Sequence, residues 1–186
     1  LFVACGDPAD LTNIFQRVET LPAELVERWL PQGKSWPTFR AYLEHLEHLP
    51  LGPNVAALLD HSALQVRIME LEKSVQGPAG SEEVAQMRRL AAEGIDAGFC
   101  GLSVDMVHWH KVSGVWAGRA LPSHHADYDE YAALAEVCRE RDAVFQVTPN
   151  PERSTSLWHI LRLGAASPRR PPLRMTLLSA LDLDTQ

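Results

Sequence analysis

Side chains that can bind a metal ion or move protons follow several short apolar runs of this sequence. Cys5, Asp60 with His61, and Ser103 each lie at or just after the end of such a run. A thiolate at the end of a strand is a ligand for a borderline-soft ion such as zinc. An imidazole beside a carboxylate can act as a metal ligand or as a general base. These residue types therefore indicate metal-ion or acid–base chemistry at strand ends.

The same residues also have ordinary structural interpretations. A free cysteine such as Cys5 commonly packs as a small hydrophobe, and a single histidine such as His61 is commonly a hydrogen-bonded structural residue. His108 and His110 lie on one side of an extended backbone, which is a spacing that suits a metal ion. A tryptophan separates them within a loop, so contact with solvent or substrate is the favoured interpretation for this pair.

Two further histidine groups are predicted to be solvated. His124 and His125 are adjacent, and adjacent side chains normally point apart. A second group falls on the polar side of an amphipathic helix and comprises Glu44, His45, Glu47 and His48. Neither group is predicted to carry chemistry.

The elements that must position these residues alternate along the chain. Short apolar runs bounded by turn residues are typical of strands, and they lie at 1–4, 55–59, 99–104, 143–147 and 173–178. Between them, apolar residues recur at the spacing of helices, at 37–48, at 82–97 after a Ser81 cap, and at 128–141 after an Asp127 and Glu130 capping box. Strands that alternate with helices favour an α/β fold with a parallel sheet covered on both faces.

One long connection stands out in this pattern. Residues 105–126 show no clear period and are rich in His, Trp and Gly. A loop of this length is uncommon in a compact domain unless it is functional. It follows a predicted strand, so it is placed to contribute to a site at that strand's end.

Composition narrows the function classes. The 186 residues include 46% hydrophobic residues, enough for a packed core, and the net charge of −7 argues against nucleic acid as a partner. Three widely spaced cysteines without a CxxC pair predict neither a disulfide framework nor a zinc knuckle, which favours a cytoplasmic location. No apolar run approaches the length of a membrane span. The sequence begins without methionine inside an apolar run, so we expect residues upstream of it.

Four segments of the sequence carry five motifs in order. They read FVACG, SWPTFRAYLEHLEHLPLGPNVAALLDHSALQ, EEVAQMRRLAAEGIDAGFCGLSVD and LPSHHADYDEYAALAEV, and the second contains two of the motifs. Together they resemble the D-aminoacylase (N-acyl-D-amino-acid deacylase) branch of the amidohydrolase superfamily. The first resembles the family's Gly-Asn-Cys-Gly segment and the third its helix that ends in Gly-Phe-Ser-Thr. The similarity runs nearly end to end, although no single motif is diagnostic.

The resemblance implies a (β/α)8 TIM barrel of the metal-dependent hydrolase type, of which residues 1–186 form about half. Such an enzyme uses zinc-activated water to hydrolyse the amide of an N-acyl-D-amino acid or a related small amide. On this resemblance, Cys5 matches the family's metal-binding cysteine, and His108 falls where related deacylases place a tyrosine near the substrate. The site residues predicted are Cys5 for metal and, for substrate, His61, Ser103 and His108. The catalytic residue is unknown, and the partners expected are a small-molecule substrate and a second copy in a homo-oligomer, without nucleic acid or membrane.

The chain departs from the family pattern at several positions. The resemblance implies that a His-x-His lies before Leu1 and a catalytic aspartate after Gln186. The family's next metal-binding histidines are missing, since the corresponding strands read FQVTPN and LRMTLLS, and Gln65 replaces an arginine. Thr and Leu cannot replace imidazole as zinc ligands. The alternative hypothesis is therefore a barrel-derived module that binds a small molecule or a protein and catalyses nothing.

Overall fold

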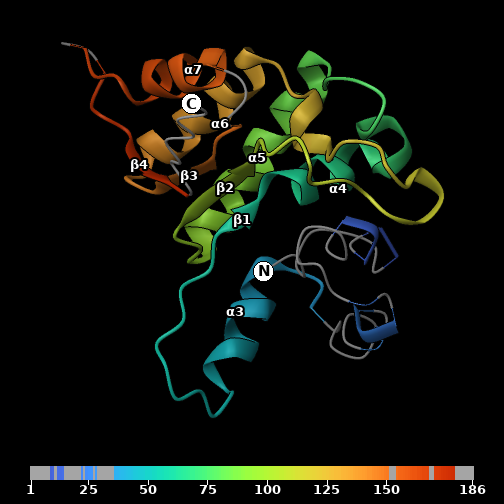
Figure 1. Cartoon of the computed structure of the whole chain (residues 1–186). Coiled ribbons are helices and arrows are strands. Elements are labelled where there is room, and N and C mark those ends of the chain that lie inside the picture. The colour runs from blue at the N-terminus through green and yellow to red at the C-terminus, as the bar shows by residue number, and fades with distance from the viewer. Residues whose placement is uncertain are drawn as a thin grey trace, which may run out of the picture.

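The computed structural model describes residues 9–10, 12–14, 22, 24–26, 28, 36–150, 154–167 and 170–178. Within this part, strands and helices alternate as the sequence predicts (Figure 1). The elements are α3 (Phe39–Glu47), β1 (Leu59–Asp60), α4 (His61–Ser74), α5 (Ser81–Ala97), β2 (Gly101–Asp105), η1 (Gly114–Trp116), η2 (Pro122–His125), α6 (Tyr128–Glu140), β3 (Val144–Thr148), α7 (Ser154–Gly164) and β4 (Arg174–Leu177). The strand predicted at 1–4, and Cys5 after it, lie outside the described residues.

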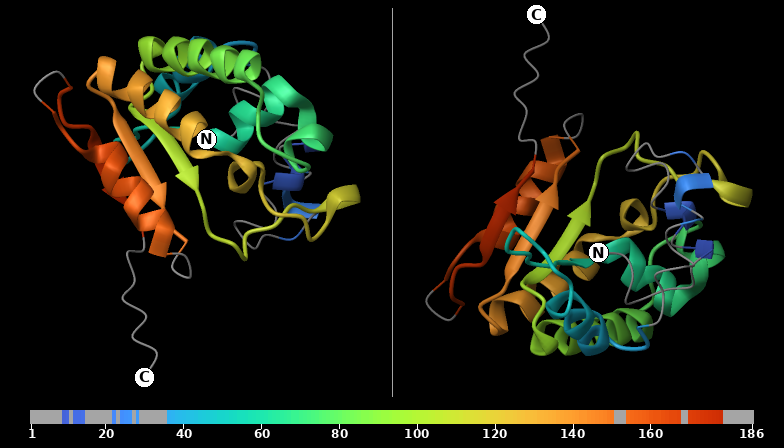
Figure 2. Two further views of the ribbon diagram at one scale, coloured as in Figure 1. Left: turned by 90° about the horizontal axis from the view of Figure 1, so that it is seen from above. Right: turned by 90° about the horizontal axis from the view of Figure 1, so that it is seen from below.

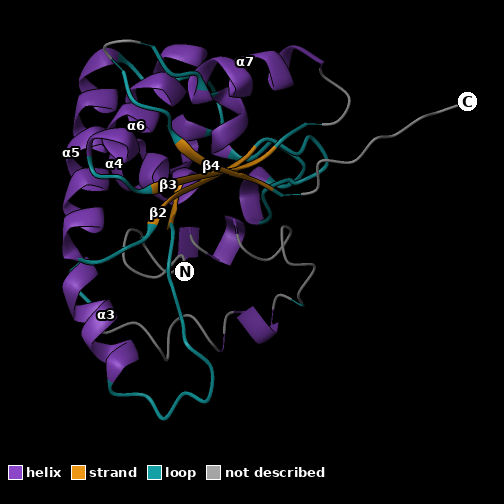
Figure 3. Ribbon diagram, turned by 90° about the vertical axis from the view of Figure 1, so that its left-hand side faces the viewer, coloured by secondary structure: helices purple, strands orange, loops and turns teal. Residues whose placement is uncertain are grey.

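The four strands form one sheet in the order β1-β2-β3-β4, and every neighbouring pair is parallel. Helices α4 to α7 gather on one side of this sheet, as Figure 3 shows in a view along it. In the view from below, the strands lie in front of α6 and α7 (Figure 2). This arrangement confirms the predicted α/β class with a parallel sheet.

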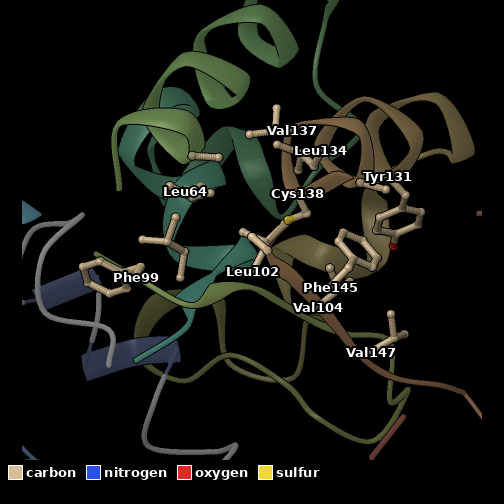
Figure 4. Close-up of a cluster of buried hydrophobic side chains, with 14 of the residues drawn as sticks. Leu64, Phe99, Leu102, Val104, Tyr131, Leu134, Val137, Cys138, Phe145 and Val147 are labelled. Carbon is tan, nitrogen blue, oxygen red and sulfur yellow. The ribbon is translucent and has the colours of Figure 1, made fainter. Parts of the chain in front are cut away.

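The core lies between the sheet and these helices. Leu102 and Val104 of β2 and Phe145 and Val147 of β3 are fully buried, and they face a layer that includes Leu134 and Cys138 of α6 (Figure 4). Burial of each such side chain stabilises the fold by about 1.5–3 kcal/mol. Ser103 and Asp105 of β2 and the alternate residues of β3 are only half-buried, so one face of these strands belongs to the core.

Several element boundaries differ from the prediction. The predicted strand 55–59 is strand only at its end, although the Cys100 N–H still donates to the Ala57 carbonyl at 2.8 Å. The residue that caps α5 is Gly80, not Ser81, because the Glu83 carboxylate accepts the Gly80 N–H at 2.7 Å and Ser81 is already helical. In α6, Asp127 caps the Glu130 N–H as predicted.

Two helices were not predicted. Helix α4 follows β1 directly, and the Asp60 carboxylate caps it by accepting the Ala63 N–H at 2.7 Å. Most of its residues are buried, and its backbone departs from helical geometry at Glu70, so its sequence shows no clear helical period. Helix α7 carries apolar side chains toward solvent, with Trp158 exposed, which also hides its period. No helix of the described part of the chain is long and apolar enough to cross a bilayer.

Candidate functional site

Polar side chains line the face of the sheet that the helices leave uncovered. Asp60, Ser103, Gln146 and Thr176 stand in one row across the four strands, because each is paired in register with the next. The Ser103 hydroxyl donates to the Gln146 side-chain oxygen at 3.1 Å. Side chains alternate between the faces of a strand, so these residues point away from the buried Leu102 and Phe145. In the described part of the chain, helices α4 to α7 cover only the apolar face of the sheet, not both faces as the sequence predicts.

Asp105 ends β2 on this polar face, in register with Thr148 of β3. Its Oδ1 accepts the N–H of Val107 at 2.8 Å, and the Val107 carbonyl accepts the N–H of His110 at 3.1 Å. These two tight turns bring the imidazole of His110 back to the strand end. There Nδ1 of His110 lies 2.5 Å from Oδ2 of Asp105.

The remainder of the 106–126 loop is tied to the framework by hydrogen bonds. The Ser123 hydroxyl donates to the Asp105 carbonyl at 2.5 Å, and the Ser123 N–H donates to the Ser62 hydroxyl at 3.2 Å. The Tyr131 hydroxyl of α6 donates to the Ser123 carbonyl. Earlier in the loop, the Ser113 N–H donates to the Asn13 carbonyl at 2.8 Å. The loop is thus positioned by α4, β2 and α6 together.

A buried polar cluster joins the start of α4 to α6. His61 Nε2 lies 2.8 Å from Glu130 Oε1, and the Gln65 amide donates to the same oxygen at 2.9 Å. All three side chains are at most 1% exposed. Edge-to-face contact with Tyr131 holds the His61 ring from the side. The cluster locks the two helices that flank the candidate site.

A cavity of about 500 Å³ lies beside the strand ends, between the 106–126 loop and helices α6 and α7. Its polar lining includes His108, Lys111, His124, His125, Asn150 and His159. The prediction of a solvated His124 and His125 pair was wrong, because both rings are partly buried in this lining. The group from Glu44 to His48 is exposed on α3 as predicted, apart from the partly buried Leu46.

Burial shifts the pKa values of three titratable groups near the strand ends. Removal from water raises the pKa of Asp60 to about 6; the nearby Asp105 carboxylate adds to this, while the Ala63 N–H and His61 oppose it. Removal from water also lowers the pKa of His124 to about 4, against the opposing attraction of Asp105. The pKa of His125 is lowered for the same principal reason. At neutral pH the two adjacent imidazoles are therefore uncharged.

The lowered pKa of His124 predicts acid sensitivity. An unfolded histidine binds its proton near pH 6.5, whereas the folded His124 resists protonation down to about pH 4. Stability present above pH 6.5 is therefore lost as the pH falls toward 4. The variant His124→Gln should reduce this loss by on the order of 2 kcal/mol. Thermal midpoints at pH 7.5 and pH 5 measure it, with the exposed His48→Gln as control, and equal acid loss in all three proteins would contradict it.

The predicted site residues fall in different settings. Cys5 lies outside the described residues, so its metal role stays a prediction. Ser103 is on the polar face and His108 lines the cavity, and for both the substrate role also stays a prediction. His61 lies in the buried cluster with Glu130, the hydrogen-bonded structural setting that was its alternative interpretation.

Sequence reasoning missed the pairing of Asp105 with His110 and the role of Glu130. The available signal was the spacing of Asp105 and His110, which are separated by a Met-Val-His-Trp segment, but their contact depends on the two turns. The position of Glu130 after Asp127 predicts a capping box. Its side chain points into the protein instead, toward His61.

The described residues do not include the set of ligands that a zinc site needs. Zinc in a hydrolase takes at least three protein ligands from His, Cys, Asp and Glu. Among the residues that the structure describes, no three such side chains converge. The ends of β3 and β4 carry Thr148 and Leu177, which are not zinc ligands. The described part of the chain does not by itself fit a zinc ion.

Comparison with known proteins gives relatives by sequence and by structure. No family model matches the chain. Uncharacterized proteins of Mycobacterium tuberculosis and Mycobacterium bovis are 33% identical over 177 residues, which is 93% of this chain and 29% of each relative. The chain thus spans less than a third of the length of these curated relatives.

Two solved structures share the fold. D-aminoacylase, described as defining a novel subset of amidohydrolases, superposes with a TM-score of 0.54 at 23% identity over 69% of this chain and 25% of that one. N-acyl-D-glutamate deacylase from Bordetella bronchiseptica, solved with zinc and a phosphonate inhibitor, gives 0.56 at 22% identity over 74% of this chain and 27% of that one. The chain therefore has an α/β fold with a parallel sheet that matches part of the TIM barrel of amidohydrolases.

Proposed function

We propose that this chain is part of a metal-dependent amidohydrolase that hydrolyses the amide bond of an N-acyl-D-amino acid or a related small amide. The observation that supports it most is the polar C-terminal edge of the sheet, with Asp60, Asp105 and His110 together, in a fold shared with two deacylases. In barrels of parallel strands, active sites form at this edge. The substrate is a small molecule, and nucleic acid and membrane are not partners.

The remainder of the site is supplied, in this proposal, by parts of a longer polypeptide. Residues 1–186 contribute about half of the barrel, and the relatives are longer than this chain. Zinc would be held by Cys5 together with residues beyond the described part, because the described part holds no converging set of ligands. Its chemistry, when bound, is to lower the pKa of a water molecule. The protein acts in the cytoplasm, where the free thiols of Cys100 and Cys138 stay reduced.

The substrate-facing residues in this proposal surround the same edge. Ser103 lies on the polar face, and His108 and Lys111 line the adjoining cavity of about 500 Å³. A cationic side chain beside the strand ends suits a substrate that carries a carboxylate. His61 would act at one remove, by holding α4 and α6 in place through Glu130.

A specific observation favours a second candidate, a barrel-derived binding module without catalysis. Thr148 and Leu177 end the strands at which the resemblance to D-aminoacylases implies metal-binding histidines. A site that has exchanged imidazole for a hydroxyl and an aliphatic side chain can still bind a small molecule. It cannot bind zinc through those positions.

Metal analysis of the complete natural polypeptide separates the two candidates. The hydrolase proposal expects zinc in stoichiometric amount in the native protein and its loss in Cys5→Ser. Cys100→Ser is the matched control, because Cys100 is an exposed free thiol at the opposite end of β2. Native protein without zinc, or with zinc that Cys5→Ser retains, would contradict the proposed metal site; the former result would favour the binding module.

A further inference from the structure

We propose that Asn13 and Ile14 position the side chain of Lys111 to bind the carboxylate of the substrate. The proposal rests on the proposed hydrolysis of an N-acyl amino acid, and it adds two positioning residues and the side chain through which they act. It is carried by the hydrogen bonds and apolar contacts that join residues 12–14, the early segment, to the 106–126 loop. Figure 2 shows this segment in blue beside the loop in yellow.

A second hydrophobic cluster lies between the early segment, α4 and the loop, apart from the larger core between the sheet and the helices. Ile14 is only 1% exposed, and it shares this cluster with Val112 and Leu121 of the loop. The other buried members come from α4 and its C-terminal end, and they are Val66, Leu71 and Val75. Removal of a buried side chain leaves a cavity that its neighbours fill only in part. Loss of the Ile14 side chain should therefore let the loop shift.

Hydrogen bonds fix the same contact at the backbone. The N–H and the hydroxyl of Ser113 both donate to the Asn13 carbonyl, at 2.8 and 3.0 Å. Gly114 follows with a φ of +68, and a Cβ at this position would lie 2.4 Å from Oδ1 of Asn13. The loop therefore passes the Asn13 side chain too closely for a larger residue than glycine.

Backbone contacts make residues 111–120 of the loop one unit. The Val112 N–H donates to the Arg119 carbonyl at 3.0 Å. Lys111 and Ala120 form an antiparallel bridge at the base of this unit. A displacement where the loop meets the early segment therefore moves Lys111 with it.

Lys111 supplies positive charge to the cavity of about 500 Å³, and its side chain is partly buried there. No carboxylate in the described part of the chain forms an ion pair with it. Burial is the main cause of the lowered pKa values of His124 and His125, and the charge of Lys111 contributes to both. Beside these neutral imidazoles, the ammonium group of Lys111 attracts an anionic group of a bound substrate.

The other end of the loop is anchored independently. The Ser123 hydroxyl donates to the Asp105 carbonyl, and the Ser123 N–H donates to the Ser62 hydroxyl. Neither bond involves the early segment, so loss of the Ile14 side chain should displace the Lys111 end of the loop and leave the η2 end in place. The expected effect is on binding of the carboxylate, and the chemistry at the strand ends should be unchanged.

The test compares kcat and KM of the complete polypeptide for two compounds. One is the fastest substrate among N-acetyl-D-leucine, N-acetyl-D-phenylalanine and N-acetyl-D-glutamate, and the other is its carboxamide, which lacks the α-carboxylate. Lys111→Met should raise KM for the acid about 10- to 100-fold and KM for the carboxamide less than about twofold. Ile14→Ala should raise KM for the acid about three- to tenfold, with kcat within about twofold. In the Lys111→Met background, Ile14→Ala should add less than about twofold.

Two further variants separate positioning from a general loss of stability. Ile14→Val keeps a branched side chain, so its KM should stay within about twofold of the native value. Met87→Ala removes a fully buried side chain of α5 from the larger core, so it should lower the thermal midpoint while KM stays within about twofold. Hydrogen exchange gives a readout that does not depend on activity. The Ser113 amide should exchange at least about tenfold faster in Ile14→Ala, whereas the α5 amides should keep their rates.

The possible failures are distinguishable. An unchanged KM or an unchanged Ser113 exchange rate in Ile14→Ala, an equal rise for acid and carboxamide, or a rise that persists in the Lys111→Met background would overturn the positioning role and leave the hydrolase proposal standing. A native protein that neither binds nor hydrolyses the three acids would overturn both. If the acids bind without amine release, the hydrolase proposal fails, and dissociation constants from calorimetry decide the positioning role by the same comparison. If Ile14→Ala does not fold, Gly114→Ala replaces it with the same expected rise in KM, because its Cβ forces the loop away from Asn13.

Discussion

Replacement of Glu130 with alanine should lower the free energy of unfolding by about 3–5 kcal/mol. Its Oε1 accepts contacts from both His61 and Gln65, and all three side chains are buried. Removal of the carboxylate leaves two buried polar groups without their partner, and it opens a cavity between α4 and α6. Urea unfolding of the complete protein measures the change.

Two controls define the size of this effect. Glu130→Gln keeps an oxygen of the same shape, so it should cost less than half as much as the alanine variant. Arg89→Ala removes an exposed ion pair to Glu82 and should change the unfolding free energy by less than about 0.5 kcal/mol. A loss below about 1 kcal/mol in Glu130→Ala would show that the buried cluster does not hold these helices together.

Substitution of Gly101 by alanine should destabilise the protein by about 3 kcal/mol or more, because it separates β2 from β3. Gly101 has φ +152, and a Cβ there would lie 1.8 Å from the Val144 carbonyl oxygen. That oxygen belongs to the neighbouring strand, so the clash can be relieved only by moving backbone. The strands that carry Asp105 and Thr148 would then lose their register, and activity should fall with stability.

The matched control is Gly77→Ala, where a new Cβ meets nothing within 4 Å. It should leave the thermal midpoint within about 2 °C of the native value. Thermal unfolding followed by circular dichroism compares the two variants directly. If the thermal midpoint of Gly101→Ala also lies within about 2 °C of the native value, Gly101 does not approach the Val144 carbonyl as closely as the structure shows.

The sequence was most informative where one face of an element meets solvent. Helix α5 has an apolar stripe that includes Met87 and Ala91 and an exposed side, so its period predicted it almost to the residue. Helix α4 is buried on most sides, and its periodicity is correspondingly weak. The parallel sheet was predictable because alternating strands and helices allow few other arrangements.

The candidate site was predictable only in outline. Strand ends identify Asp60, Ser103 and Asp105, because parallel strands bring their C-terminal ends to one edge. The contact of Asp105 with His110 depends on two consecutive turns, which local residue preferences do not specify. Burial of Glu130 depends on packing between helices that are far apart in the sequence.

Turnover of N-acyl-D-amino acids by the complete polypeptide tests the central claim most directly. The account predicts that the native protein releases amine, and that it does so faster from at least one N-acyl-D-amino acid than from its L-enantiomer. Native protein that binds such compounds but releases no amine, over a panel of acyl groups and with zinc supplied, would contradict it and leave a binding module with the fold of part of an amidohydrolase.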